Sequence, residues 1–347
     1  MFYRIKALSG AGIKIKLHIF YKDFPSLETL IQYCEIIYLY KRKPVWKFKN
    51  LHTPLFVQSR RDDELVRLIA QDDDPILFEG IHTAYSIGDT RWAHKKKYIR
   101  MMNDESEYYY HLYKIEDNAI PKLYFLLESR LCRTFQSGIF KKVDHVFAIS
   151  SEEQKLLNTQ NCESTWIPPF FDSTDLSKTG SGDYLLYHGD LSIKENADAA
   201  NFLIKEIIPH TKFKLIIAGN NPGNKLTNIA TSNIQLVNSP DQDQMNQLIS
   251  DAHIILLPFS QATGYKIKLL QSLAKGRHII TSDIIQSFTE LSGLIQFAGT
   301  VNGWIEKINE LTNRPFTEED RMSRKMIMEK YFNQEKNAQK IKQIIFN

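Results

Sequence analysis

HIILLPFSQATGYKIKLLQSLAKG, residues 253–276, decides the fold, because a short apolar strand leads directly into an amphipathic helix. The helix is predicted to begin near Thr263 and Gly264, whose residue types suit an N-terminus, and to end at Gly276. Its buried stripe is predicted to contain Ile267, Leu270, Leu273 and Ala274. A strand that passes at once into a helix is the unit from which parallel sheets are built.

Two lysines, Lys266 and Lys268, lie in the opening turn of this predicted helix. They face the positive end of the helix dipole, where each cation costs from a few tenths to about 1 kcal/mol. An anion held between the ammonium groups and the exposed backbone N–H groups would remove this conflict, and helix N-termini commonly bind phosphate. The segment therefore predicts either a phosphate site or a lysine face exposed to water.

Short apolar segments alternate with helical segments from residue 183 onward. The predicted strands are DYLLYHGD (183–190), KLIIAG (214–219), IQLVN (234–238), HIILLPF (253–259) and HIITS (278–282). Strands that are apolar on both sides are typical of a parallel sheet covered by helices on both faces. This half of the chain is therefore predicted to be a Rossmann-like domain.

The first half repeats this pattern less regularly. Its predicted strands are KIKLHIFY (14–21), EIIYLY (35–40), PILFEGI (75–81), KYIRMM (97–102) and HVFAIS (145–150), with helices near 26–33, 63–70 and 121–135. The stretch WIPPFFDSTDLSKTGSGD (166–183) has the Pro, Gly, Ser and Thr content of an interdomain linker. We predict a first domain at 1–172, a second at 173–333, and a final helix at 334–347 that crosses back to the first domain.

The opening residues, MFYRIKALSGAG (1–12), read as a helix. A Rossmann-like domain normally opens with a strand and a glycine-rich loop, so the first domain is predicted to lack its N-terminal strand. Its absence would leave KIKLHIFY and PILFEGI without a shared neighbour. Either the natural start lies upstream or this form is impaired.

The composition is that of an ordinary globular protein, with 43% of the 347 residues hydrophobic and 24% charged. The formal net charge of +4 gives no indication of a nucleic-acid partner, and none is expected. Three widely separated cysteines fit a reducing compartment and no zinc site. No apolar run reaches the roughly 20 residues of a membrane helix. We expect a cytoplasmic protein, with peripheral contact to the inner face of the membrane near Trp46 as a further expectation.

Several motifs follow one another in order along both halves. They are YHGDLSIKENADAANFL, KLIIAGNNP, LISDAHIILLPF, TGYKIKLLQSLAKG and HIITS in the second half, and PILFEGIHTAYS, RMMNDESEYYYHL, FKKVDHVFAISSEEQKLL and IPPFFD in the first. This series resembles the family 4 glycosyltransferases, or group 1 glycosyl transferases. The resemblance implies the α/β GT-B fold, in which two Rossmann-like, doubly wound domains face each other across a cleft.

The segment TGYKIKLL resembles the branch of this family with a TG-x-K-x-K donor-phosphate motif, which implies that Lys266 and Lys268 bind the diphosphate. The family usually has glutamates at the positions of Thr263 and Gln271. Gln271 can still hydrogen-bond a ribose, whereas Thr263 removes a charged contact to the donor sugar. The donor-binding residues implied by the resemblance are Gly189, Lys194, Asn238, Pro258, Ser260, Thr263, Gly264, Lys266, Lys268 and Gln271.

The first domain supplies candidates for the chemistry of transfer. Glu79 and His82 follow a predicted strand at positions where the family places polar groups near the reacting sugar carbon, which makes them catalytic candidates. The acceptor-side candidates are Thr83, Asn103, Glu105 and Tyr109. Simpler alternatives are a structural histidine, capping and packing roles for the acceptor-side residues, a helix-start lysine at Lys194 and a turn residue at Asn238.

The resemblance implies a retaining transfer of a sugar from a nucleotide diphosphate to a hydroxyl, with no metal ion or other cofactor. The acidic clusters agree, because Asp72–Asp74 and Asp241 with Asp243 fit a turn and a helix start. The expected partners are a nucleotide sugar and a glycan or lipid-linked acceptor, in polysaccharide or glycoconjugate synthesis. The alternatives are a noncatalytic nucleotide-sugar-binding or partner subunit of the same fold and, with less support, a sugar epimerase or phosphorylase.

Overall fold

The computed structural model describes residues 1–44, 50, 52–221, 233–262, 264–286 and 288–347. The chain divides into two compact units. Unit 1 contains Met1–Phe170, residues 264 and 265, and Gln334–Asn347, and unit 2 contains Phe171–Ala262 and Lys266–Asn333. The main change of unit falls between Phe170 and Phe171, beside the predicted boundary at residue 172.

In the described residues, unit 2 is built around a six-stranded parallel sheet with the strand order β12-β11-β10-β7-β8-β9. Its strands are β7 (Tyr184–His188), β8 (Lys214–Gly219), β9 (Ile234–Asn238), β10 (Ile254–Leu257), β11 (His278–Ser282) and β12 (Gln296–Ala298). The first five match the predicted apolar segments, and β12 is an additional strand. The central strand β10 is buried along its whole length, as its continuous apolar run predicts.

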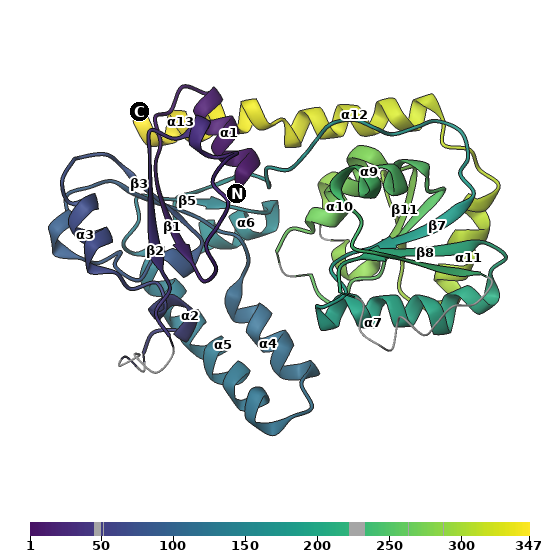
Figure 1. Cartoon of the computed structure of the whole chain (residues 1–347), viewed down its shortest axis with the longest axis horizontal. Helices are drawn as coiled ribbons and strands as arrows, with labels where there is room; N and C mark the ends of the chain where they lie inside the picture. Colours follow the sequence, from purple (N-terminus) through teal and green to yellow (C-terminus); the bar gives the residue numbers. More distant parts are fainter. Residues whose placement is uncertain (45–49, 51, 222–232, 263, 287) are drawn as a thin grey trace. The chain divides into compact units, whose positions relative to one another are not determined.

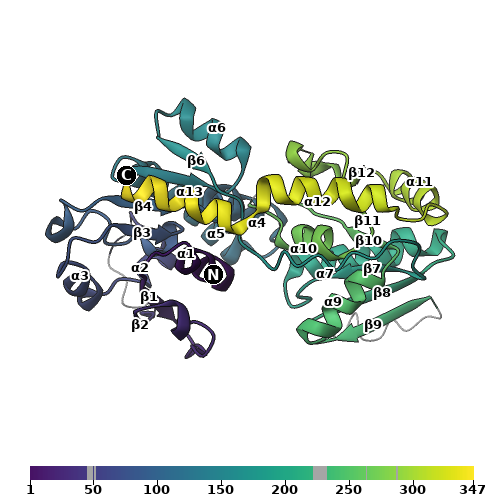
Figure 2. The ribbon, with the colours of Figure 1, turned by 90° about the horizontal axis from the view of Figure 1, so that it is seen from above.

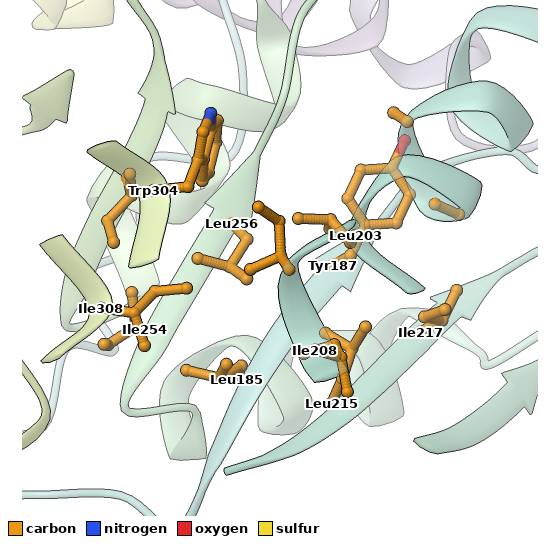
Figure 3. Close-up of a cluster of buried hydrophobic side chains, with 14 of the residues drawn as sticks. Leu185, Tyr187, Leu203, Ile208, Leu215, Ile217, Ile254, Leu256, Trp304 and Ile308 are labelled. Atoms are coloured by element: carbon orange, nitrogen blue, oxygen red, sulfur yellow. The ribbon is translucent and has the colours of Figure 1, made fainter. Parts of the chain in front are cut away.

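Helices cover both faces of this sheet (Figure 1). They are α7 (Lys194–Phe202), α9 (Gln242–Asp251), α10 (Ile267–Lys275), α11 (Val301–Thr312) and α12 (Glu318–Phe332), with the π-helical segment η5 (Leu203–Ile207) and the short 3-10 helices η6 (Ile208–His210), η7 (Asp283–Ile285) and η8 (Thr289–Leu291). On one face, Leu185 and Tyr187 of β7 share a buried cluster with Trp304 and Ile308 of α11 (Figure 3). Helices α9 and α10 lie on the other face. Asp241 caps α9 through a capping box with Gln244, which confirms its predicted place at a helix start.

The described residues of unit 1 contain two separate parallel sheets, a four-stranded sheet β3-β4-β5-β6 and a two-stranded sheet β1-β2. The strands are β1 (Lys16–Tyr21), β2 (Ile36–Lys41), β3 (Ile76–Glu79), β4 (Lys97–Arg100), β5 (His145–Ala148) and β6 (Ser164–Trp166). Their register leaves β1 and β3 unpaired with each other in this part of the chain. This division is the one expected where two strands lack a shared neighbour.

The helices of unit 1 are α1 (Phe2–Gly10), α2 (Leu55–Gln58), α3 (Asp63–Ile69), α4 (Glu105–Ile115), α5 (Ala119–Phe140), α6 (Ser151–Thr159) and α13 (Gln334–Phe346), with the turns η1 (Ile31–Tyr33), η3 (Ile81–Thr83) and η4 (Thr90–Trp92). The helix predicted near 26–33 is wrong, because only η1 forms there. Leu30 alone is buried in that segment, and one apolar side chain is too little to stabilise a longer helix.

The two ends of the chain meet in unit 1, where α13 packs beside α1 (Figure 2). Lys342 Nζ of α13 donates a hydrogen bond of 2.7 Å to the carbonyl oxygen of Ala11. Tyr98 of β4 donates through its hydroxyl to the carbonyl oxygen of Ile345 at 3.2 Å. A shared buried cluster that includes Leu8 and Ile341 holds both helices against the sheet.

Helices α4 and α5 form an antiparallel hairpin that extends from the body of unit 1 (Figure 1). Asp104 caps α4 by accepting hydrogen bonds from the N–H groups of Ser106 and Glu107. Ser129 in the middle of α5 donates to the carbonyl oxygen of Ser106 at 2.8 Å. None of the helices in the described residues is both long enough and apolar enough to cross a bilayer.

Candidate functional site

The lysine-bearing helix α10 begins at Ile267, and Lys266 is its N-cap residue. The predicted start near Thr263 and Gly264 is therefore wrong by about one turn. Gly264 has a φ of +64°, a left-handed conformation that suits glycine and turns the chain before the helix. Thr263 lies outside the described residues.

The buried stripe of α10 matches the prediction at Leu270, Leu273 and Ala274 and differs from it at Ile267. Leu269, Leu270 and Leu273 are fully buried, but Ile267 is 41% exposed because it lies on the outer side of the first turn. Gly276 has an extended backbone, not the left-handed conformation of a helix C-terminus. A Cβ there would lie 2.2 Å from Ile255 Cδ1, so glycine is required for close packing of the helix end on β10.

Lys268 is held by contacts to two elements of unit 2. Its Nζ donates hydrogen bonds to Asn196 Oδ1 at 2.9 Å and to the Tyr187 hydroxyl at 3.3 Å. The same ammonium group lies 5.0 Å from the ring centroids of both Tyr187 and Phe259. Lys266 Nζ lies 5.6 Å from the Phe259 ring, so the two lysines share one aromatic surface.

Both lysines are partly buried, which sets them apart from an exposed lysine face. Burial lowers the pKa of Lys266 to about 8. Burial, and then the neighbouring charge of Lys266, lower the pKa of Lys268 to about 8. Two cations are thus held close together in a partly desolvated environment, at the N-terminus of α10. That end of a helix attracts anions. An anion bound between them would favour their charged forms.

Asn196 connects the loop after β7 to the two lysines. The side-chain Nδ2 of Asn196 donates to the backbone carbonyl oxygen of Asp190 at 2.8 Å. The backbone carbonyl oxygen of Asn196 accepts a hydrogen bond from the Tyr187 hydroxyl at 3.0 Å. A Cβ on Gly189 would lie 3.3 Å from Asn196 Cγ, so the glycine lets the loop approach this side chain. Asn196 therefore connects the strand end, the loop and Lys268.

A carboxylate lies near the two lysines. Gln261 Nε2 donates to Glu195 Oε1 at 3.1 Å and to Oε2 at 3.3 Å. The negative charge of Glu195 raises the pKa of both Lys266 and Lys268, against the lowering caused by burial. Glu195 thus provides part of the negative charge that the lysines attract.

The other predicted donor residues lie mostly at the same edge of the sheet. Three of them lie at the carboxyl ends of strands: Gly189 follows β7, Asn238 ends β9, and Pro258 follows β10. Asn238 is exposed and accepts a hydrogen bond from Ser239, a residue with φ of +49°. Ser260 is exposed beyond Pro258, Lys194 is exposed at the first residue of α7, and Gln271 is partly buried in α10. Their roles stay predictions.

In unit 1, Glu79 at the end of β3 is engaged by a cation. Its Oε1 lies 2.8 Å from Arg4 Nε of α1, and Arg4 is almost fully buried. Arg100, the register partner of Glu79 on β4, is also buried, and burial lowers its pKa to about 10. Glu79 is therefore paired with Arg4 through Oε1, whereas its Oε2 is buried without a hydrogen-bond partner among the described residues.

The catalytic candidate His82 and the acceptor-side candidate Glu105 lie together. His82 Nε2 is 3.6 Å from Glu105 Oε1. Burial, together with Arg60 and Arg42, lowers the pKa of His82 to about 4, so the imidazole is neutral at pH 7. Burial and the neighbouring Asp104 raise the pKa of Glu105 to about 7.

The remaining acceptor-side candidates have structural contacts. Tyr109 stacks on Phe56 with ring centroids 5.6 Å apart, and burial raises its pKa. Thr83 donates to the carbonyl oxygen of Gly80 at 3.2 Å. Asn103 Oδ1 is buried without a hydrogen-bond partner among the described residues. Capping and packing thus account for Tyr109 and Thr83, and Asn103 retains an unused acceptor.

Five residues of the lysine site were not among the predicted site residues: Tyr187, Glu195, Asn196, Phe259 and Gln261. The sequence contained a signal for four of them, since Tyr187, Glu195 and Asn196 lie within the motif YHGDLSIKENADAANFL and Phe259 ends the motif LISDAHIILLPF. Among the described residues, no three His, Cys, Asp or Glu side chains gather in a way that could hold a metal ion.

Known proteins share this architecture. Residues 182–314, most of unit 2, match the family Glycosyl transferases group 1. Unit 2 is a group 1 glycosyl transferase domain. The glycosyl transferase domain contains the entire lysine site described above, from Tyr187 on β7 to Lys268 on α10.

The fold class of the whole chain is GT-B. The crystal structure of TarM superimposes with a TM-score of 0.61 at 15% identity, over 86% of this chain and 59% of TarM. The Arabidopsis thaliana protein UGT89C1, in a complex with UDP, superimposes with a TM-score of 0.59 at 12% identity, over 99% of this chain and 95% of that one. The chain therefore spans less than two thirds of the length of TarM.

A relative in Klebsiella pneumoniae extends the similarity beyond the glycosyl transferase domain. It is described as an uncharacterized 44.6 kDa protein in the cps region. The two sequences are 24% identical over 308 residues, which cover 81% of this chain and 77% of the relative.

Proposed function

We propose that this chain is a retaining glycosyltransferase that moves a sugar from a nucleotide-diphosphate donor to a hydroxyl acceptor, with no metal ion. The observation that carries the proposal is the pair Lys266 and Lys268 at the start of α10 in the glycosyl transferase domain. Their depressed pKa values reflect the cost of holding two cations there. A diphosphate between them would offset that cost and accept hydrogen bonds from the first backbone N–H groups of the helix.

The reaction needs charge stabilisation more than it needs a strong base. As the bond between the anomeric carbon and the phosphate oxygen breaks, negative charge builds on the diphosphate, where the two ammonium groups stabilise it. The acceptor oxygen forms the new bond, and its proton passes to the departing phosphate oxygen. The neutral His82 is suited to hydrogen-bond an acceptor hydroxyl without taking its proton. Glu105 would orient this imidazole.

The substrate classes follow by analogy. UGT89C1 was crystallised with UDP, which supports a nucleoside diphosphate as the donor group for this fold. The Klebsiella pneumoniae relative lies in a cps region, which supports polysaccharide synthesis and a glycan or lipid-linked acceptor. We place the reaction in the cytoplasm, at the inner face of the membrane where such acceptors are exposed. Trp46, the predicted membrane-contact residue, lies outside the described residues.

A second candidate is a noncatalytic subunit that binds a nucleotide sugar without turnover. The divided sheet of unit 1 favours this candidate. A ligand at the carboxyl ends of the strands would meet two separate sheets there in place of one continuous sheet. The threonine at residue 263, where the family has a glutamate, also favours it. The paired lysines fit both candidates, because a noncatalytic subunit that binds a nucleotide sugar would also hold a diphosphate between them. Turnover is therefore the property that separates the two candidates.

The deciding experiment is a transfer assay on the full chain with a panel of nucleotide sugars and hydroxyl acceptors. We expect turnover with one donor, retention of the anomeric configuration by NMR, and an unchanged rate in EDTA. Nucleotide binding without turnover for any pair would support the subunit, and release of free sugar phosphate with inorganic phosphate would indicate a phosphorylase. A rate abolished by EDTA would contradict the metal-free mechanism.

Donor binding is expected to weaken as the pH rises through about 8, the pKa of both lysines. Below that pH both groups are ammonium ions and attract phosphate, and above it they lose their charge. Binding near this pH must therefore take up protons, because the bound anion raises both pKa values. Calorimetry of UDP binding in buffers with different ionisation enthalpies measures this uptake. Binding without proton uptake and without pH dependence would mean that the lysines do not contact the diphosphate.

A further inference from the structure

The first two turns of α5 expose an apolar face that the described residues leave largely open to solvent. Ile120 is 85% exposed, Leu123 58%, Leu127 49% and Tyr124 36%. The spacing i, i+3, i+4 and i+7 places these four side chains on one face of the helix. Tyr109 of α4 contacts Phe125 and also the partly exposed Tyr124, with ring centroids 6.2 and 6.3 Å apart. Ile120, Leu123 and Leu127 are therefore additional to the surface that holds the hairpin together, and Tyr124 borders both surfaces.

Charged residues of opposite sign border this stripe at its two ends. Asp117 precedes the N-cap residue of α5, and Arg130 follows Leu127 by three residues; both are exposed. An antiparallel pair of identical helices, related by a twofold axis between Leu123 and Tyr124, places Asp117 opposite Arg130 of the second copy. The same axis places Ile120 opposite Leu127. Apolar contacts in the middle and opposite charges at both ends make this face complementary to itself.

We propose that the stripe Ile120, Leu123, Tyr124 and Leu127 is a twofold interface with a second copy of this chain. The hairpin turn carries Glu116 and Asp117 beside Lys114 and Lys122, so it has no net positive charge with which to attract an anionic bilayer, and this disfavours a lipid partner. The interface lies in unit 1 and uses no residue of the lysine site.

The area of the stripe sets the strength of the dimer. Stable dimers commonly bury about 800 Å² on each partner, and two helical turns supply less than that. We therefore expect a reversible dimer with a dissociation constant in roughly the micromolar range. Because the end contacts are ion pairs near water, the association should weaken with added salt.

The test is sedimentation velocity of the full chain over a concentration series. The wild type is expected to shift from monomer to dimer, and Leu123→Glu to raise the dissociation constant by at least about tenfold. Asp117→Arg and Arg130→Asp should each weaken self-association, because each places like charges opposite one another. Mixed together they should form a heterodimer, since both cross-pairs are then of opposite charge. Thermal melts of each variant show whether it is folded.

The heterodimer keeps the proposal falsifiable even if Leu123→Glu fails to fold. A wild-type chain that stays monomeric at about 100 µM would overturn it. Dimerisation unaffected by the charge reversals, or no heterodimer from the mixed variants, would also overturn it. Flotation of the chain with vesicles of phosphatidylcholine and phosphatidylglycerol, lost in Leu123→Glu, would assign the stripe to lipid and contradict the dimer.

Discussion

Replacement of Lys268 by alanine is expected to lower kcat/KM for the nucleotide-sugar donor by about 100- to 1,000-fold. The ammonium group is partly buried and is positioned by Asn196 and Tyr187. In the proposed mechanism this group would stabilise charge on the leaving diphosphate without reorganising during the reaction. Most of the loss should appear in kcat, because the charge increases on reaching the transition state. Steady-state kinetics with the donor identified in the panel measures both parameters.

Two further variants make this test specific. Lys212→Ala removes an exposed lysine of the same glycosyl transferase domain and should leave kinetics unchanged. Asn196→Ala keeps the Lys268 charge but removes its positioning contact and the hydrogen bond to the Asp190 carbonyl, so we expect an intermediate loss of roughly tenfold. Full activity in Lys268→Ala, with Lys212→Ala equally active, would refute the diphosphate role of Lys268.

Gly219→Ala is expected to lower the free energy of unfolding by about 3 kcal/mol and to abolish donor binding. A Cβ on Gly219 would lie 1.8 Å from the carbonyl oxygen of Gly189, and backbone cannot move aside as a flexible side chain can. The two glycines lie where β7 and β8 end side by side, joined by the hydrogen bond from Gly189 N–H to the carbonyl oxygen of Ala218. Any shift there displaces the loop that Asn196 anchors. Urea denaturation and UDP calorimetry measure the two effects.

Gly138→Ala is the matched control for this substitution. Gly138 lies in α5, and a Cβ there meets nothing within 4 Å. Alanine is the better helix former, so this variant should gain roughly 0.5–1 kcal/mol of stability. If Gly219→Ala were as stable as the wild type, the close approach of the β7 and β8 ends would be disproved.

The strands β7, β8, β10 and β11 of the glycosyl transferase domain could be predicted because each is buried along nearly its whole length. A strand such as β10 must then be apolar at every residue, and that leaves a continuous run in the sequence. In unit 1 the five predicted strands form as β1 to β5, whereas the additional strand β6 is short and only partly buried, and the segment at 26–33 has a single buried residue. Partial burial weakens the pattern that distinguishes a strand from a helix or turn.

The lysine pair could be predicted from local sequence, because helix position depends on neighbouring residues. The predicted start was one turn early, since the left-handed backbone of Gly264 delays the helix. The sequence also indicated Glu79 as a catalytic candidate, but Arg4 engages it from a helix 75 positions away. No local sequence pattern predicts an ion pair between residues so far apart in the chain.

Residues 253–276 thus establish on their own that a buried parallel strand enters a helix with two cations at its positive end. Apolar periodicity and helix dipoles act over a few residues, so a sequence records them directly. The environment of those cations depends on contacts that span 72 and 81 positions, from Lys268 to Asn196 and to Tyr187. Burial, and with it the lowered pKa of both lysines, arises only when the sheet brings β7, α7 and α10 together.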